Sequence, residues 1–151
     1  MKFLVLIHVL SAIIGVGPTF FAHVLYRPKQ TVNELRQSAK LAGLLEFFPK
    51  IGGTIAVLSG LLLFWLGEYG TFTQLWLLGS LILYVLIQIV VIALATPPAK
   101  KLAQWLADPA NKHHQDTLPE APKQLLRQVN NLFYVATSMG TLLFIFMILK
   151  P

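Results

Sequence analysis

Histidines have the widest chemical range of the side chains in this sequence, because an imidazole can ligate a metal or haem iron and can carry a proton near neutral pH. The chain has four histidines and no cysteine, which excludes disulfides, thiolate catalysis and Cys-ligated zinc or iron–sulfur centres. His8 and His23 lie in a long apolar segment, so they are the first candidates for a functional site. His113-His114 and Asp116 lie in a polar stretch, and their spacing fits no standard zinc site.

His8 and His23 belong to a stripe of small and polar residues spaced by three and four positions, as on one face of a helix. Three other apolar segments carry comparable stripes. Because lipid tails cannot satisfy polar groups, the stripes should face one another inside a bundle. They can equally be packing faces, where small residues allow close approach and hydroxyls or amides bond between helices. The stripes are His8, Ser11, Ala12, Gly15, Thr19, Ala22 and His23; Glu46, Lys50, Gly53 and Gly60; Trp76, Ser80, Tyr84 and Gln88; and Asn130, Tyr134, Thr137, Ser138 and Thr141.

Six of the polar residues should lie in the cytoplasmic half of the membrane if the segments pack antiparallel. Among them, Glu46 precedes Lys50 by four positions, which is the favourable order for an ion pair on a helix. Ionisable groups inside a membrane are functional candidates by default. The alternative is that Lys50 extends to the lipid headgroups and Glu46 follows it. The predicted intramembrane cluster consists of His23, Glu46, Lys50, Gln88, Asn130 and Tyr134.

Composition identifies the elements that must position these residues. The chain has 151 residues, of which 56% are hydrophobic and 12% are charged, about half the charged fraction of a soluble domain. The apolar residues gather in four long runs, which excludes a soluble enzyme, a secreted disulfide scaffold and a disordered tail. We predict an all-α, antiparallel four-helix bundle that is integral to the membrane as a single domain, residues 1–151. Its spans are expected at about 3–26, 46–66, 71–95 and 125–149.

Local signals refine the second helix. Thr31 and Glu34 have the spacing of a capping box. From there the helical pattern continues to Leu66, about 54 Å at 1.5 Å per residue, so the first turns should project beyond a ~30 Å hydrocarbon layer into the cytoplasm. Pro49 removes one backbone hydrogen bond and should kink this helix near the membrane surface.

The connection between the third and fourth spans should lie at the membrane surface. Pro97-Pro98 is expected to close the third span. Beyond it, Leu102, Trp105 and Leu106 share one helical face beside two lysines, which predicts a short amphipathic helix on the inner membrane surface. Residues 108–122 are then expected to form a solvated loop.

The distribution of positive charge predicts the orientation. Twelve Lys and Arg face six Asp and Glu, a net charge of +6. Nine of the twelve lie in or beside two segments, 27–45 and 96–124. By the positive-inside rule these segments are cytoplasmic and both termini lie outside, in a bacterial inner membrane. Insertion and anionic headgroups account for the basic charge, so the bilayer is the expected partner and nucleic acid is not.

The first apolar segment also has a recognisable sequence. It reads Ile7-His8-Val9-Leu10-Ser11-Ala12, with Gly17 nine residues after His8 and then Phe20-Phe21. This pattern, with Ser59-Gly60-Leu61 and the Trp76-led third span, resembles the copper-resistance protein D superfamily. Within it the chain is similar to a family of uncharacterised bacterial four-span integral membrane proteins.

The superfamily also holds the membrane protoporphyrinogen oxidase of the J type, a haem-b protein. A histidine of its first span and a lysine early in its third matter for haem and activity. The resemblance implies that His8 binds haem b. The lysine has no counterpart, because Leu77-Leu78-Gly79-Ser80 follows Trp76.

Three functions follow from these residues. The first is redox chemistry with haem b or a metal at His8. The second is a transporter or channel for a small ion, proton or polar solute that uses His23, Glu46 and Lys50. The third is a non-catalytic membrane protein whose polar stripes only hold the bundle together. Four helices are few for a private pathway, so a homo-oligomer is expected, joined through the small-residue face of Gly52, Ala56 and Gly60.

Overall fold

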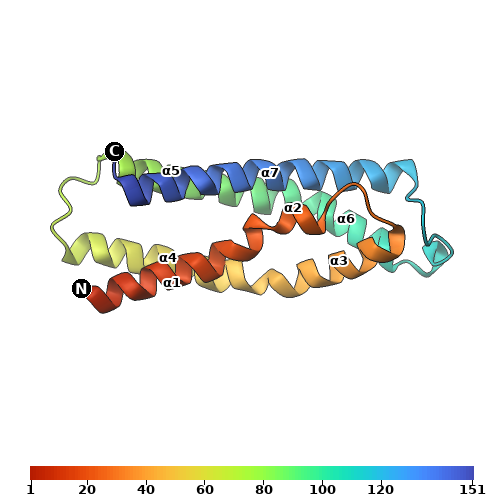
Figure 1. Cartoon of the computed structure of the whole chain (residues 1–151), viewed down its shortest axis with the longest axis horizontal. Coiled ribbons are helices and arrows are strands. Elements are labelled where there is room, and N and C mark those ends of the chain that lie inside the picture. The colour runs from red at the N-terminus through yellow and green to blue at the C-terminus, as the bar shows by residue number, and fades with distance from the viewer.

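Four helical rods run antiparallel along one axis (Figure 1) in a computed structural model that describes residues 1–151. The first rod comprises α1 (Lys2–Phe20) and α2 (Ala22–Leu25), and the second α3 (Val32–Leu45) and α4 (Phe47–Leu66). The third comprises α5 (Leu75–Gln88), a π-helical stretch η1 (Ile89–Ala95) and α6 (Thr96–Ala107). The fourth is α7 (Glu120–Leu149), preceded by a 3₁₀ turn, η2 (Pro109–Asn111). The predicted all-α four-helix bundle is confirmed.

Each rod is long and apolar enough to cross a membrane. Only 23 of the 151 residues are buried, and the exposed side chains include Phe3 and Trp65, with exposed fractions of 73% and 83%. In water such an apolar surface would be unstable, whereas in a bilayer it faces lipid. The surface therefore agrees with hydrocarbon as the solvent for most of the chain.

Proline explains two breaks in the rods. Pro18 has no N–H to donate to the carbonyl of Ile14, and α1 ends two residues later. Pro49 likewise leaves the carbonyl of Leu45 without its helical donor, and the second rod breaks at Glu46, between α3 and α4. The kink expected near Pro49 is thus present.

The third rod differs from expectation, because it does not end at Pro97-Pro98. The helix continues through both prolines to Ala107. Proline is tolerated in the first turn of a helix, where its missing donor is least costly. The π-helical stretch precedes it, and the Thr96 hydroxyl donates to the carbonyl of Val91 at 2.8 Å. The amphipathic segment is therefore α6, which extends the third rod and packs against α3 and α7 instead of lying separately on the membrane surface.

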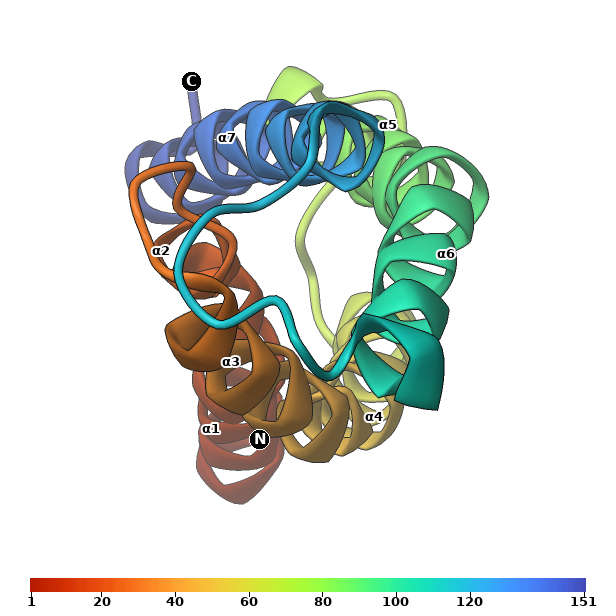
Figure 2. The ribbon, with the colours of Figure 1, turned by 90° about the vertical axis from the view of Figure 1, so that its right-hand side faces the viewer.

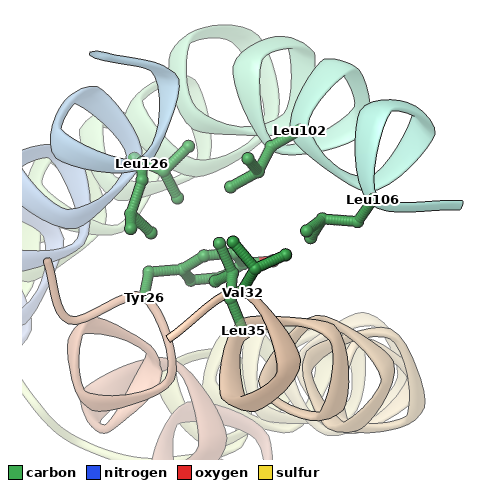
Figure 3. Close-up of a cluster of buried hydrophobic side chains, with 7 residues drawn as sticks. Tyr26, Val32, Leu35, Leu102, Leu106 and Leu126 are labelled. Carbon is green, nitrogen blue, oxygen red and sulfur yellow. The ribbon is translucent and has the colours of Figure 1, made fainter. Parts of the chain in front are cut away.

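The most deeply buried apolar side chains lie where α2, α3, α6 and α7 meet (Figure 3). Val32, Leu102 and Val129 have exposed fractions of 0%, and Leu35 and Leu126 of 1%. Because α3 and α6 are amphipathic, their apolar faces turn inward here and their charged faces outward. The seven residues of this core are Tyr26, Val32, Leu35, Leu102, Leu106, Leu126 and Val129.

We call this end of the molecule the basic end, because it carries residues 27–40, 96–116 and 120–127 with nine of the twelve Lys and Arg. The predicted capping box is formed there: the N–H of Glu34 donates to Thr31 Oγ1 at 3.2 Å, and the N–H of Thr31 donates to Glu34 Oε2 at 2.8 Å. The loop before α7 passes over this end of the bundle (Figure 2). Both chain termini lie at the opposite end (Figure 1).

Arg36 of α3 holds that loop in place. Its guanidinium donates to the carbonyls of Asn111 and His114, both at 2.8 Å, and to that of Leu106 at 3.3 Å. Two backbone hydrogen bonds add to the contact, from Val32 and Asn33 to the carbonyls of residues 116 and 115. The segment predicted as a solvated loop is therefore bonded to the start of α3.

Candidate functional site

Helices α1 and α4 form the most extensive contact in the molecule, and glycine makes it possible. A Cβ atom added at Gly15 would lie 2.6 Å from the backbone carbon of Gly52, and one added at Gly52 would lie 2.5 Å from the Cα of Gly15. Two backbones can approach this closely only where neither residue has a side chain. The small-residue stripes of the first and second segments therefore meet within one chain.

This contact corrects the interface predicted for a homo-oligomer. The face of Gly52, Ala56 and Gly60 was expected to join two copies of the chain. Instead it packs against α1 of the same chain, with Gly15 on Gly52 and the His8 ring on Gly60. Gly60 has no Cβ because one would lie 2.9 Å from the ring carbon of His8.

His8 is fixed to α4 by one ring nitrogen. Its Nδ1 lies 2.8 Å from the carbonyl oxygen of Ala56 and 3.3 Å from the hydroxyl of Ser59. Because a carbonyl only accepts, Nδ1 must carry the hydrogen, which leaves Nε2 of a neutral ring as an acceptor. No hydrogen bond joins Nε2 to another group of the chain. This is the arrangement in which a histidine binds a metal through Nε2, with Nδ1–H oriented by a backbone carbonyl.

A narrow cavity of about 50 Å³ lies at the centre of the bundle, between all four rods. Its polar lining comprises two hydroxyls of threonine, the hydroxyl of Tyr84 and the carboxamide of Gln88. The Tyr84 hydroxyl points toward α4, where a Cβ added at Gly53 would lie 3.2 Å from it. No hydrogen bond joins this hydroxyl or the Gln88 carboxamide to any other group. The lining residues are Gly15, Val16, Thr19, Phe20, Pro49, Gly53, Tyr84, Ile87, Gln88, Ala136, Thr137, Gly140, Leu143 and Phe144.

The cavity lies at the level where three of the rods break. Phe20 is the last residue of α1, Pro49 follows the break at Glu46 by three residues, and Gln88 is the last residue of α5 before the π-helical stretch. Only α7 passes this level as one continuous helix. Broken helices and π-helical insertions recur at binding sites inside membrane proteins, because they free backbone groups there.

Three of the six residues predicted as an intramembrane cluster lie together. The ring of His23 packs against the ring of Tyr134 with centroids 4.5 Å apart, and Asn130 Nδ2 donates to the carbonyl of His23 at 2.9 Å. His23 Nδ1 is buried without a hydrogen-bond partner. A buried polar atom left unpaired is costly, so His23 stands out among the ionisable groups of the spans.

The other three residues do not join them. Lys50 Nζ lies 3.2 Å from Glu46 Oε2, but the two side chains are 71% and 56% exposed, so the pair lies on the outer surface of the second rod. Gln88 lines the central cavity instead. The structure thus separates the predicted cluster into a His23 group, an exposed ion pair and a cavity residue.

The two loop histidines lie against each other and against α6. His113 and His114 stack with ring centroids 4.1 Å apart, and His114 lies against Trp105 at 5.5 Å. No group of three or more His, Cys, Asp or Glu side chains is arranged to hold a metal ion. These imidazoles serve to pack the loop against α6.

Over residues 2–151 the chain matches the family described as predicted integral membrane protein (DUF2269). The chain belongs to this family. No curated protein and no solved structure matches the chain. The DUF2269 match agrees with the four apolar rods, and it establishes the uncharacterised membrane family that the sequence indicated.

Two features of this DUF2269 protein were absent from the sequence interpretation. No role was predicted for Arg36, although an arginine about one turn into an amphipathic helix is suited to binding several carbonyls. The central cavity was also not predicted: Tyr84 was assigned only to the stripe of the third segment, and Gln88 to that stripe and to the intramembrane cluster. The spacing of four positions in that stripe indicated that Tyr84 and Gln88 share one face of the helix.

Proposed function

We propose that this protein conducts a small hydrated ion across the bacterial cytoplasmic membrane, and that the ion is the proton. The observation that carries the proposal is the central cavity, where Tyr84 and Gln88 have no partner within the chain at the level of the helix breaks. Membrane interiors offer no water to such groups, so polar side chains there call for ordered water or a ligand. A cavity of about 50 Å³ has room for a few water molecules.

The size and composition of the cavity favour the proton over larger solutes. The lining offers hydroxyl and carboxamide groups, which both donate and accept hydrogen bonds and can order a chain of water molecules. Imidazoles, which can both donate and accept hydrogen bonds, lie on both sides along the first rod: His8 toward the chain termini and His23 toward the basic end. In this proposal the exposed Glu46–Lys50 pair lies outside the pathway.

Proton flux into proteoliposomes tests the proposal. A potassium gradient with valinomycin sets the membrane potential, and an enclosed pH-sensitive dye reports proton entry. We expect flux above that of protein-free liposomes, and Tyr84→Phe should lower it about tenfold, equivalent to roughly 1.4 kcal/mol for one lost hydrogen bond in the pathway.

Tyr69→Phe is the matched control, because it removes the same hydroxyl from a tyrosine of the loop between α4 and α5 that does not line the cavity. It should leave the flux unchanged. Equal effects of the two variants, or flux no greater than that of empty liposomes, would contradict proton conduction. Sodium or potassium flux that depends on Tyr84 would identify a larger ion as the cargo.

Haem b binding at His8 is the second candidate. It is favoured by the Nδ1 hydrogen bond to Ala56, which leaves Nε2 for a ligand, and by the resemblance of the first segment to the copper-resistance protein D superfamily. The fit is limited to one axial ligand: His23 lies fifteen residues farther along the same rod, and His113 and His114 lie in the loop at the other end of the bundle. The central cavity does not include His8 and is too small for a tetrapyrrole.

A spectrum of the detergent-purified protein distinguishes the two candidates. Haem ligation by His8 predicts a Soret band after expression with haem supplementation, and His8→Ala should abolish it while His23→Ala should not. A spectrum without a Soret band would remove haem and leave the proton proposal intact.

Orientation and assembly are part of the same proposal. We propose that the basic end is cytoplasmic and both termini are outside, because nine of the twelve Lys and Arg lie at that end. A C-terminal alkaline phosphatase fusion should be active and a C-terminal green fluorescent fusion dark.

A homo-oligomer would have to use lipid-facing side chains, since the glycine face of α4 is occupied by α1. The mass of the detergent-solubilised particle tests whether one forms.

A further inference from the structure

A second hollow lies on the outside of the bundle, where the third rod changes from η1 to α6 and runs beside α7. It is a groove of about 390 Å³ with polar and apolar walls in nearly equal measure. Its lining residues are Ala93, Leu94, Pro97, Pro98, Lys101, Leu125, Gln128 and Leu132.

The groove is polar at one end and apolar at the other. Lys101 and Gln128 lie toward the basic end, whereas Leu94 and Leu132 lie about one to two helical turns deeper, toward the middle of the apolar rods. At 1.5 Å per residue, the seven residues from Leu94 to Lys101 span about 10 Å along the rod. This order, with charge first and hydrocarbon deeper, is also the order of groups along an anionic phospholipid.

Proline leaves a free acceptor in the wall of the groove. In an α-helix the carbonyl of Ala93 would accept from residue 97 and in a π-helix from residue 98, but both are proline and have no N–H. The nearest remaining donor, the N–H of Thr96, bonds to the carbonyl of Val91 instead. The carbonyl of Ala93 therefore has no backbone donor, and it adds a polar acceptor to the wall of the groove.

Charge indicates which lipid fits. Lys101 is an exposed side chain and the one cation that lines the groove, and no acidic side chain lines it. Basic pockets between helices at a membrane surface attract anionic headgroups. Phosphatidylcholine and phosphatidylethanolamine carry no net charge, so Lys101 favours a lipid whose headgroup is anionic.

We propose that this groove binds an anionic phospholipid, phosphatidylglycerol in the test below, with its phosphate at Lys101 and an acyl chain along Leu94 and Leu132. The site is separate from the central cavity, and it does not depend on what the cavity conducts.

Native mass spectrometry of the detergent-purified protein tests the site. The protein is mixed with phosphatidylglycerol, phosphatidylethanolamine or phosphatidylcholine of identical acyl chains, and bound lipid is counted. We expect phosphatidylglycerol to bind best, and Lys101→Gln to lower its binding about fivefold, which corresponds to the loss of one cation near a headgroup. Lys100→Gln is the matched control, because it removes the same charge from the adjacent residue outside the groove, and it should change binding less than twofold.

Ala93→Leu is a second test of the site, in which no charged residue is changed. Ala93 is exposed, so a larger side chain fills the groove while the bundle remains folded, which thermal unfolding without lipid verifies. This variant should reduce phosphatidylglycerol binding as Lys101→Gln does. Equal losses of phosphatidylglycerol binding for Lys100→Gln and Lys101→Gln would show that only the overall positive charge of the surface matters, and would overturn the site. Binding of phosphatidylcholine or phosphatidylethanolamine as strong as that of phosphatidylglycerol would overturn its headgroup specificity.

Discussion

At the scale of single residues, close backbone contact at glycines and the hydrogen bond of one histidine hold two helices together. Gly15 and Gly52 bring two backbones into contact, and the Nδ1–H of His8 ties the same helices together at the carbonyl of Ala56. Such contacts replace the large interlocking side chains of a soluble core, because lipid provides no hydrophobic force between helices. The polar stripe of the first segment is therefore first of all a packing face.

Gly15→Ala should destabilise the protein by about 1–3 kcal/mol, because the added methyl would overlap backbone that has no rotamer to change. Gly17→Ala is the control on the same helix: a Cβ there would meet nothing within 4 Å. Alanine also favours helix over glycine, so Gly17→Ala should be neutral or slightly stabilising. Thermal unfolding in detergent measures both, and equal melting temperatures for the two variants would contradict the close contact.

At the scale of elements, the helices and most of their ends could be predicted from the sequence. Apolar runs gave the four spans, the Thr31–Glu34 pair gave the start of α3, and Pro49 gave the break between α3 and α4. Pro97-Pro98 was misleading, since the same residue type that precedes the end of α1 and follows the break between α3 and α4 lies at the start of α6 without ending the rod. A local signal does not reveal whether a proline falls inside a helix or in its first turn, because tertiary packing of α6 decides that.

The candidate site was less predictable than the helices. Depth alone suggested that six polar residues gather, yet rotation of each helix about its axis separates the Glu46–Lys50 pair from His23. Rotation is set by contacts such as Gly15 on Gly52, which join residues far apart in the chain. The period of a single segment defines its polar face, but the direction of that face depends on the neighbouring helices.

Arg36 provides a prediction at this scale. Arg36→Ala removes donors from two carbonyls of the loop before α7 and from one in the last turn of α6, and should destabilise the basic end by about 1.5–3 kcal/mol. Hydrogen exchange should then speed up over residues 107–119 and leave α1 and α4 unchanged. Lys40→Ala, an exposed cation of the same helix, is expected to stay within about 0.5 kcal/mol of the unmodified protein. Faster hydrogen exchange throughout the bundle would contradict a local role for Arg36 in holding the loop.

At the scale of the whole molecule, two kinds of packing are joined end to end. The apolar rods meet through small residues and turn their large side chains to lipid, whereas the basic end encloses leucines and valines as a soluble protein does (Figure 3). The length of α7 agrees with this division: thirty residues span about 45 Å, more than the ~30 Å of bilayer hydrocarbon.

This division predicts where truncation of a leucine matters. Leu35→Ala, in the core of the basic end, should lower the free energy of unfolding by about 2–5 kcal/mol. Leu61→Ala, at a residue that is 46% exposed on α4, should cost far less, since lipid replaces the lost contacts. Denaturation monitored by tryptophan fluorescence compares the two, and a larger loss for Leu61→Ala would contradict the division.

The contact between Gly15 and Gly52 has a mechanical consequence. A contact between two backbones cannot relax by a change of side-chain rotamer, so we expect α1 and α4 to move as one rigid unit. Any widening of the space between the rods must then come from the opposite wall, where α5 and α7 pack as a second pair. Opening of the bundle would thus move α5 and α7 relative to α1 and α4, which stay together.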